Sequence, residues 1–388
     1  HFCLNDAEKE VLPPSKPYWK PELSDVYLRN NQTEAELSNE LWEHFKESVH
    51  LHLRSDVKLG LNLSGGMDSG TLCLLMDQLT DSGVPLSSYT IGYGKSDYDE
   101  ILYTELIPKN RIWERFEVGF SAQESADNFI DDVYSFEEPI GGIATQAYKK
   151  LHHFAKQRGV KVLLEGQGVD EMLGGYGYYR GLLTAKNKLQ SSVDNVDTPL
   201  FYQDNTRFLA PELLSQDGPV PVVSLTPFQA PFETAVENAM YADLFHRRVP
   251  RVLRMNDRLS MAHGVELREP FLTSKLAEFC FSIPYQFKVK QGQSKSILRT
   301  ALDMRVPEFA KTCAQKRAVS APQREWLQNE LNTLVWDLLE SKDFTECGAF
   351  DVPKVHKAYE DYVKYGADNS FFIWQWMNFA AWLRVFRV

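Results

Sequence analysis

The sequence predicts an α/β protein built on a doubly wound parallel sheet, followed by a largely helical C-terminal part. The chain has 388 residues and is 43% hydrophobic, which is enough for a sizeable core. Strand-like and helix-like segments alternate between about residues 57 and 175, and this alternation is typical of parallel strands joined by right-handed crossovers. From about residue 230 onward the pattern is helical.

Short apolar runs bounded by turn residues predict the strands of the sheet. In the first run, Val57, Leu59, Leu61 and Leu63 alternate, so we expect them on one face of a strand. The four expected strands cover residues 57–63, 86–92, 111–118 and 160–166.

Helices are predicted from capping signals and apolar periodicity. Residues 33–36 have the form of a capping box, and apolar residues then recur at every fourth position from Leu37 to Val49. The closing run at 371–386 contains Gln375, Asn378 and Arg384, so it reads as a buried aromatic helix, not a membrane span. Other helices are expected in residues 69–83, 99–107, 122–136 and 145–159.

Composition argues against several classes of function. The formal net charge of −11 disfavours a nucleic-acid partner, and no apolar run is long enough to cross a membrane. The five cysteines are odd in number and form no CxxC pair, so we expect reduced thiols, no structural zinc site and a cytoplasmic location.

The first motif that carries chemistry is the glycine turn Ser64-Gly65-Gly66, which joins a strand to a helix. Such a turn directs backbone N–H groups at an anion, and the helix N-terminus adds a favourable dipole. Asp68 and Ser69 follow at once, where a Mg²⁺ ion on bound phosphates would need an oxygen ligand. Neither GxxxxGK[ST] nor GxGxxG is present. The alternative is a plain tight turn with a helix-capping aspartate.

A second glycine turn, Gly166-Gln167-Gly168, also ends a predicted strand, and Asp170 and Glu171 follow it. Ligands of doubly wound sheets bind at the carboxyl ends of strands, so Asp170 could complete a metal site from the opposite side. The alternative is a pair of acids that only stabilises a helix N-terminus.

Two further motifs mix charged with apolar residues, and the second of them consists of two segments. Residues 254–271 are densely charged, and the plain alternative is an internal salt-bridge network. The last motif consists of residues 293–302 and 314–322, which contain Lys295 and Lys316. The plain alternative is that both are solvated surface lysines.

These four motifs, in this order and spacing, resemble the synthetase domain of the asparagine synthetase family. The resemblance covers roughly residues 35–388 and includes "FEEP" at 136–139 and the closing aromatic segment. It implies the PP-loop ATP-pyrophosphatase fold and cleavage of ATP to AMP and pyrophosphate. The family includes β-lactam synthetases and lasso-peptide cyclases. It also implies three parts for this chain: an arm or linker at 1–32, an ATP-binding synthetase domain at 33–230, and a helical part at 231–388 that completes the active site.

The resemblance assigns roles to individual residues. Asp68 and Asp170 would bind Mg²⁺, and Lys316 would stabilise the oxyanion near the acyl carbon. The ATP phosphates would be held by Ser64, Gly65, Gly66, Asp68, Ser69 and Lys295. The adenine pocket would be lined, largely through backbone, by Asn62, Leu63, Ile91 and Gly166.

The implied reaction has two steps. A substrate carboxylate, on a small molecule or a peptide, attacks ATP and gives an acyl-adenylate and pyrophosphate. An amine or ammonia then attacks the adenylate, and AMP leaves far more readily than oxide would. The nucleophile must lose a proton, so a general base or a solvent path is required.

The sequence departs from the family pattern around the acceptor. Position 167 commonly carries Glu or Tyr, but Gln167 can only orient a substrate because an amide has no useful basicity. Glu266 matches the family glutamate that partners this position, so we expect it to be the acid–base or orienting residue. The alternative is that Glu266 only pairs with Arg258 or Arg268. Glu269 stands where a small apolar residue is usual, which indicates a reshaped acceptor pocket.

Glutamine-dependent members carry an N-terminal glutaminase domain, whereas only about 30 residues precede the synthetase segment here. We therefore expect either a separate glutaminase or N-terminal subunit, or an enzyme that uses ammonia or an amine directly. A specialised biosynthetic amide ligase is the favoured reading. The alternatives are the synthetase subunit of a glutamine-dependent asparagine synthetase, an intramolecular macrolactam- or β-lactam-forming cyclase, and a catalytically inactive scaffold.

Overall fold

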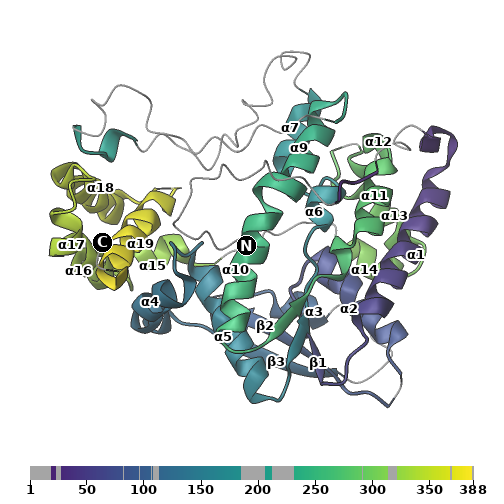
Figure 1. Cartoon of the computed structure of the whole chain (residues 1–388), viewed down its shortest axis with the longest axis horizontal. Coiled ribbons are helices and arrows are strands. Elements are labelled where there is room, and N and C mark those ends of the chain that lie inside the picture. Colours follow the sequence, from purple (N-terminus) through teal and green to yellow (C-terminus); the bar gives the residue numbers. More distant parts are fainter. Residues whose placement is uncertain are drawn as a thin grey trace, which may run out of the picture.

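The computed structural model describes residues 19–22, 28–81, 83–95, 97–105, 107, 113–184, 206–211, 231–290, 292–312, 321–367 and 369–386. Its centre is a five-stranded, all-parallel sheet in the order β3-β2-β1-β4-β5 (Figure 1). The strands are β1 (Leu59–Asn62), β2 (Leu86–Gly92), β3 (Trp113–Gly119), β4 (Val162–Leu164) and β5 (Glu266–Arg268).

The strand order contains one reversal of direction. From β1 the chain adds β2 and then β3 on one side, and it returns to add β4 and β5 on the other side of β1. In doubly wound sheets, ligands bind at the carboxyl ends of the strands where the order reverses. That point lies here between β1 and β4.

The sheet confirms the predicted fold class, with two differences. Leu59, Leu61 and Leu63 lie in one apolar core as predicted, but all four residues of β1 are buried, so neither face of the strand meets solvent. Val57 lies before the strand and is exposed. Strands covered by helices on both faces have no solvent side and need no alternation.

The second difference is β5, which lies in the part of the chain that the sequence predicts to be helical. This strand has only three residues, two of them charged, and no strand pattern could be recognised in it. It pairs with β4, and Glu266 lies opposite Val162 at the start of both strands.

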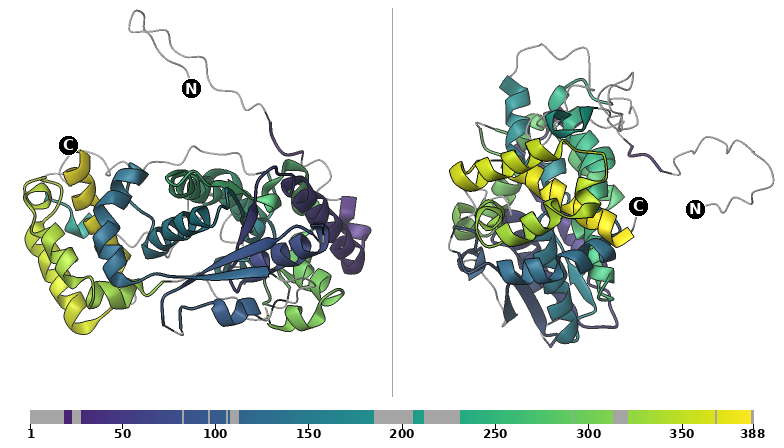
Figure 2. Two further views of the ribbon diagram at one scale, coloured as in Figure 1. Left: turned by 90° about the horizontal axis from the view of Figure 1, so that it is seen from below. Right: turned by 90° about the vertical axis from the view of Figure 1, so that its left-hand side faces the viewer.

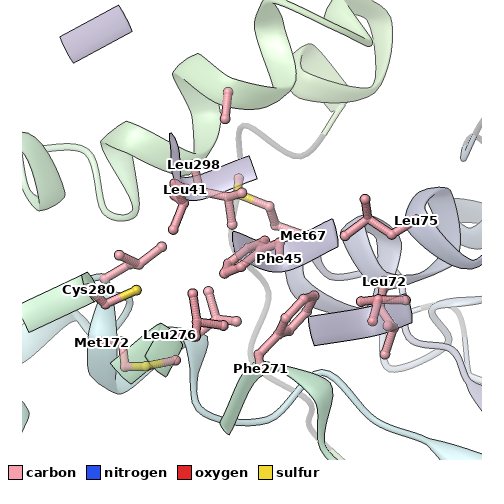
Figure 3. Packing of buried hydrophobic residues seen from close by; sticks show 14 of the residues in the cluster. Leu41, Phe45, Met67, Leu72, Leu75, Met172, Phe271, Leu276, Cys280 and Leu298 are labelled. Carbon is pink, nitrogen blue, oxygen red and sulfur yellow. The ribbon is translucent and has the colours of Figure 1, made fainter. Parts of the chain in front are cut away.

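One face of the sheet is covered by a group of helices with a continuous apolar core (Figure 3). The capping box at Thr33 and Glu36 is confirmed, and it begins α1. The helix after the glycine turn ends at Leu79, before the expected Gly83, because Thr80 is already extended. The group comprises α1 (Glu34–His52), α2 (Met67–Leu79), α11 (Ser274–Ser282) and α13 (Ser296–Asp303).

The other face is covered by α5 (Ile143–Gln157), which packs on β2 and β3, and by α10 (Val249–Met261), which packs on α5 and β5. Tyr89, Leu151 and Leu163 are fully buried between these layers.

A second helical group lies beyond α4 (Ala122–Phe136), at the opposite end of the molecule from α1 (Figures 1 and 2). Its apolar core is separate from the first and contains Trp374 and Met377 of the closing helix, which confirms the predicted buried aromatic helix. The group comprises α15 (Gln323–Gln328), α16 (Asn332–Leu339), α17 (Lys342–Thr345), α18 (Val352–Tyr365) and α19 (Phe371–Phe386).

The remaining elements are short. None of the described helices is long and apolar enough to cross a membrane. Among the described cysteines, Cys73 and Cys280 are buried and Cys347 is partly buried. The short helices are α3 (Ile101–Glu105), α6 (Val169–Met172), α7 (Gly177–Thr184), α9 (Ala235–Ala242), α12 (Tyr285–Lys288) and α14 (Pro307–Thr312), with a π-helical turn at Asp243–Arg247 and 3-10 turns at Leu28–Asn31, Thr206–Phe208 and Pro270–Leu272.

Candidate functional site

Hydrogen bonds between Ser64 and Ser69 join the glycine turn after β1 to the first turn of α2. The Ser69 hydroxyl donates to the Ser64 carbonyl at 2.8 Å and accepts from the Ser64 N–H at 3.2 Å. The Gly66 N–H donates to the Ser64 hydroxyl at 3.2 Å. Gly66 caps α2 without any side-chain hydrogen bond, so the helix N-terminus keeps first-turn N–H groups available for an anion.

Two glycines of the site pack closely against neighbouring residues. A Cβ on Gly65 would lie 2.5 Å from the Cβ of Tyr103, so only glycine lets the turn pack against α3. A Cβ on Gly166 would lie 3.1 Å from the backbone of Asp68 and of Ser69. The loops after β1 and β4 therefore touch at the reversal point of the sheet.

Lys295 joins the two predicted metal ligands. Its Nζ lies 2.6 and 2.7 Å from the two carboxylate oxygens of Asp68 and 2.8 Å from Oδ1 of Asp170. The Lys295 side chain is only 5% exposed. Burial alone would lower the pKa of Lys295, but the two carboxylates outweigh burial and raise that pKa. The ammonium is therefore charged and holds the two acids together.

The residues present fit a magnesium ion. Within the described residues, no group of three or more His, Cys, Asp and Glu side chains has an arrangement that could hold a metal ion by itself. Mg²⁺ is commonly bound through one or two carboxylates plus substrate phosphates, and Asp68 and Asp170 supply two carboxylates beside an anion-binding turn. Gly175 leaves room for this arrangement, because a Cβ there would lie 1.6 Å from Oδ1 of Asp170.

The four residues predicted to line the adenine pocket lie on the three central strands or directly after them. Leu63 cannot offer its N–H to a ligand, because that group donates to the Tyr89 carbonyl at 2.9 Å. The side chain of Asn62 is buried and donates to Glu165, which directly follows β4. Ile91 lies on β2, and Gly166 borders the turn itself.

Gln167 lies between Gly166 and Gly168, whose φ of +94° favours glycine. The Gln167 side chain is half-buried and makes no hydrogen bond to another described residue. Lys316 lies outside the described residues.

Glu266 is not brought to the glycine turns. It begins β5 at the amino edge of the sheet, opposite Val162, and its side chain is 55% exposed. Arg268 donates to the Glu266 carboxylate at 2.6 Å and to the His52 carbonyl at 2.7 Å. The structure therefore shows the Arg268 pairing that the sequence left open, and it does not favour an acid–base role for Glu266.

Glu269 lies at the opposite end of β5 from Glu266. It directly follows β5, at the carboxyl edge, and the Glu165 N–H donates to the carbonyl of the preceding residue at 2.9 Å. Burial, and then the charges of Glu165 and Asp257, raise the pKa of Glu269 to about 7. Sequence reasoning noticed Glu269 only as a departure from a family pattern. Recognition of β5 would have identified it by the same strand-end rule that identified Asp170.

Comparison of the sequence with known proteins identifies a matching family and several relatives. The family model described as "Asparagine synthase" matches residues 40–384. Asparagine synthetase (glutamine-hydrolyzing) 1 of Bacillus subtilis strain 168 is 28% identical over 95% of this chain and 62% of its own length. A putative asparagine synthetase (glutamine-hydrolyzing) of Mycobacterium bovis is 26% identical over 97% of the chain and 62% of its own length. Amidase chry2 of Gibberella zeae is 22% identical over 86% of the chain and 60% of its own length. The chain thus spans about three-fifths of these relatives.

Proposed function

Because the chain belongs to the asparagine synthase family, we propose that it is an ATP-dependent, AMP-forming amide ligase. The observation that carries the proposal is Lys295, buried between Asp68 and Asp170 beside an uncapped helix N-terminus. A fixed cation, two metal-binding acids and free N–H groups are what departing pyrophosphate requires.

In the adenylation step, the Ser64–Gly66 turn and the first turn of α2 hold the phosphates. Lys295 exchanges a carboxylate for a phosphate oxygen and stabilises the charge on the leaving pyrophosphate. Bound Mg²⁺, held by Asp68 and Asp170, would supply further charge neutralisation. Lys316 remains our candidate for stabilising the oxyanion, and Asn62, Leu63, Ile91 and Gly166 remain our candidates for lining the adenine pocket.

In the amide-forming step, the acceptor must lose a proton. We assign the base to Glu269 instead of Glu266, because Glu269 lies at the carboxyl end of β5, near Glu165, and burial raises its pKa to about 7. Gln167 can orient the acceptor through its amide group without taking the proton.

The identity of the acceptor is a separate part of the proposal. Gln167 and Glu269 both depart from the family pattern beside the glycine turns, which favours a specialised biosynthetic member. The competing readings are a synthetase subunit supplied with ammonia by a separate glutaminase, and an intramolecular macrolactam- or β-lactam-forming cyclase. The cytoplasmic location inferred from cysteine usage stays a prediction.

The adenylation step can be tested by ATP–pyrophosphate exchange with a panel of carboxylic acids. We expect acid-dependent exchange for the wild-type chain. Asp68→Asn should lower it at least about 100-fold, because it removes a carboxylate from the pyrophosphate site. Asp127→Asn is the matched control, since Asp127 is exposed on α4 and contacts only Gln123 at 2.7 Å among the described residues.

Full exchange by Asp68→Asn would refute the metal assignment. Absence of both exchange and ATP binding in the wild type would refute the ligase proposal and favour an inactive scaffold.

A further inference from the structure

A buried polar cluster borders the glycine turns, and three of its five residues, His152, Glu165 and Asn256, have no role in the chemistry described above. We name it the Glu165 cluster, and it consists of Asn62, His152, Glu165, Asn256 and Glu269. We propose that the Glu165 cluster binds the protonated primary amine of a substrate. This proposal rests on the proposed ligase function for its place in the reaction, because it specifies which class of substrate that site selects.

Two residues of the cluster lie within two residues of a glycine turn along the chain. Asn62 ends β1 and is separated from Ser64 by a single residue. Glu165 directly precedes Gly166, which contacts the first turn of α2. A group bound by the cluster therefore lies beside the atoms that react.

Glu165 is a buried carboxylate whose hydrogen-bond partners are neutral. The residue is 3% exposed, and its Oε2 accepts from Nδ2 of Asn256 at 2.8 Å. Its Oε1 accepts from Nδ2 of Asn62. Amide donors satisfy hydrogen bonds but leave the negative charge uncompensated, and a buried uncompensated charge is costly.

No strong counter-charge is found for the two glutamates. Within the described part of the chain, neither Glu165 nor Glu269 forms an ion pair with a lysine or arginine. His152 is fully buried with its Nε2 3.8 Å from Oε1 of Glu165, yet neither ring nitrogen has a hydrogen-bond partner. Glu165 therefore has the His152 imidazole at ion-pair distance without a hydrogen bond, and the charge of Glu165 acts on Glu269.

The unfilled groups of the cluster are acceptors. Oδ1 of Asn62 is buried and has no partner. The orientation of this amide follows from chemistry, because only its NH₂ group can bond to the Glu165 carboxylate. A protonated amine carries three donors, one positive charge and no acceptor, so it would satisfy both the orphaned carbonyl oxygen and the charge of Glu165.

Such an amine could come from two substrates. It could be a substituent of the acid that is adenylated, or it could be the acceptor that attacks the adenylate. The two sources share the same chemistry at the cluster, and they differ in the half-reaction in which the cluster acts.

The test compares discrimination ratios of the wild type and Glu165→Gln at pH 7. Exchange is measured with short ω-amino acids against the matching fatty acids, for example 4-aminobutanoate against butanoate. Amide formation is measured with primary alkylamines against hydroxylamine, which is largely uncharged at this pH. Glu114→Gln is the matched control, because Glu114 is an exposed glutamate paired with Lys58 at 3.1 Å at the amino end of β3.

We expect Glu165→Gln to reduce one of these preferences at least about tenfold, as the loss of a charge-assisted hydrogen bond would. A change in exchange identifies the acid as the source of the amine, and a change in the KM of the alkylamine identifies the acceptor. Unchanged ratios would overturn the proposal. A raised KM for ATP with unchanged ratios would also overturn it, because the cluster would then bind the amino group of adenine.

Calorimetric binding of 4-aminobutanoate and of 1,4-diaminobutane separates this proposal from the ligase function. If the wild type shows no exchange with any acid, binding of an amine that is lost in Glu165→Gln still supports the cluster. Absence of amine binding to the wild type overturns the proposal. If Glu165→Gln does not fold, Asn62→Leu removes the orphaned acceptor and gives the same comparison.

Discussion

At the residue scale, the site depends on which carboxylates reach the carboxyl edge of the sheet. The sequence identified Asp68 and Asp170 correctly as neighbours, because each follows a strand that its apolar pattern had predicted. Glu266 was favoured because it matches a family glutamate, and Glu269 was not considered as the base because β5 carries no recognisable strand pattern. Glu266 begins this short strand and Glu269 directly follows it, so only Glu269 lies at the carboxyl edge of the sheet.

The assignment of Glu269 predicts a pH dependence for amide formation. A carboxylic acid with a pKa of about 7 acts as a base only above that value, so kcat should rise with pH through about 7. Glu269→Gln should remove this rise and lower kcat by about 100-fold or more. A single-turnover measurement of amide formation between pH 5.5 and 8.5 checks both expectations.

Glu266→Gln is the matched control, and its pH profile should follow that of the wild type. If Glu266→Gln removes the rise and Glu269→Gln retains it, the base is Glu266, as the family resemblance implies, and not Glu269.

At the scale of single elements, the turn between α6 and α7 positions Asp170, the second proposed metal ligand. The Gly175 N–H donates to the Asp170 carbonyl at 2.7 Å, which folds the turn back over the start of α6. A side chain at position 175 would meet both the Asp170 carboxylate and Cε of Lys295, at 1.6 and 2.5 Å. The sequence indicates a glycine-rich turn here, but only the packed structure reveals why one of its glycines has no substitute.

We therefore expect Gly175→Ala to move Asp170 away from Lys295 and to lower ATP–pyrophosphate exchange at least about tenfold. Gly181→Ala is the control, since a Cβ there meets nothing within 4 Å. In the interior of α7 the control should stabilise the protein by about 0.5–1 kcal/mol. Equal exchange by both variants would show that the Gly175 contact does not position the acid.

At the scale of the whole molecule, the closing helix ties the second helical group to the sheet. The Asn378 carboxamide oxygen accepts from the Ile140 N–H at 2.7 Å, and the Trp374 indole donates to the Ile140 carbonyl at 2.8 Å. Ile140 directly follows the "FEEP" segment that enters α5. The closing helix is thus fixed to the loop that leads into α5, a helix that packs on β2 and β3.

Asn378→Leu keeps the approximate volume but leaves the buried Ile140 N–H without a partner. We expect it to lower the free energy of unfolding by about 1–3 kcal/mol, as measured by urea denaturation. Gln375→Leu is the control, because Gln375 lies on the exposed side of the same helix. A loss as large in the control would show that helix polarity, and not the Ile140 contact, sets the stability.

The fold was largely predictable because apolar runs separated by helices leave few topologies. The phosphate turn and Asp68 were predictable because glycines and an acid at a strand end have a local chemical reason. The contact of Lys295 with both acids, the network around Glu165 and the position of Glu269 were not, since each joins segments about 100 residues or more apart. No local pattern records such contacts, and Lys316 and residues 185–205 and 212–230 lie outside the described part.

The late position of β5 also bears on how the protein is made. A chain synthesised only as far as residue 230 already has the glycine turns, Asp68 and Asp170. It still lacks Lys295, and its sheet ends at β4 with an unpaired edge. Pairing between β4 and β5 must wait for a long stretch of chain, which slows folding. A chain that ends before residue 295 therefore also lacks the cation that joins Asp68 and Asp170.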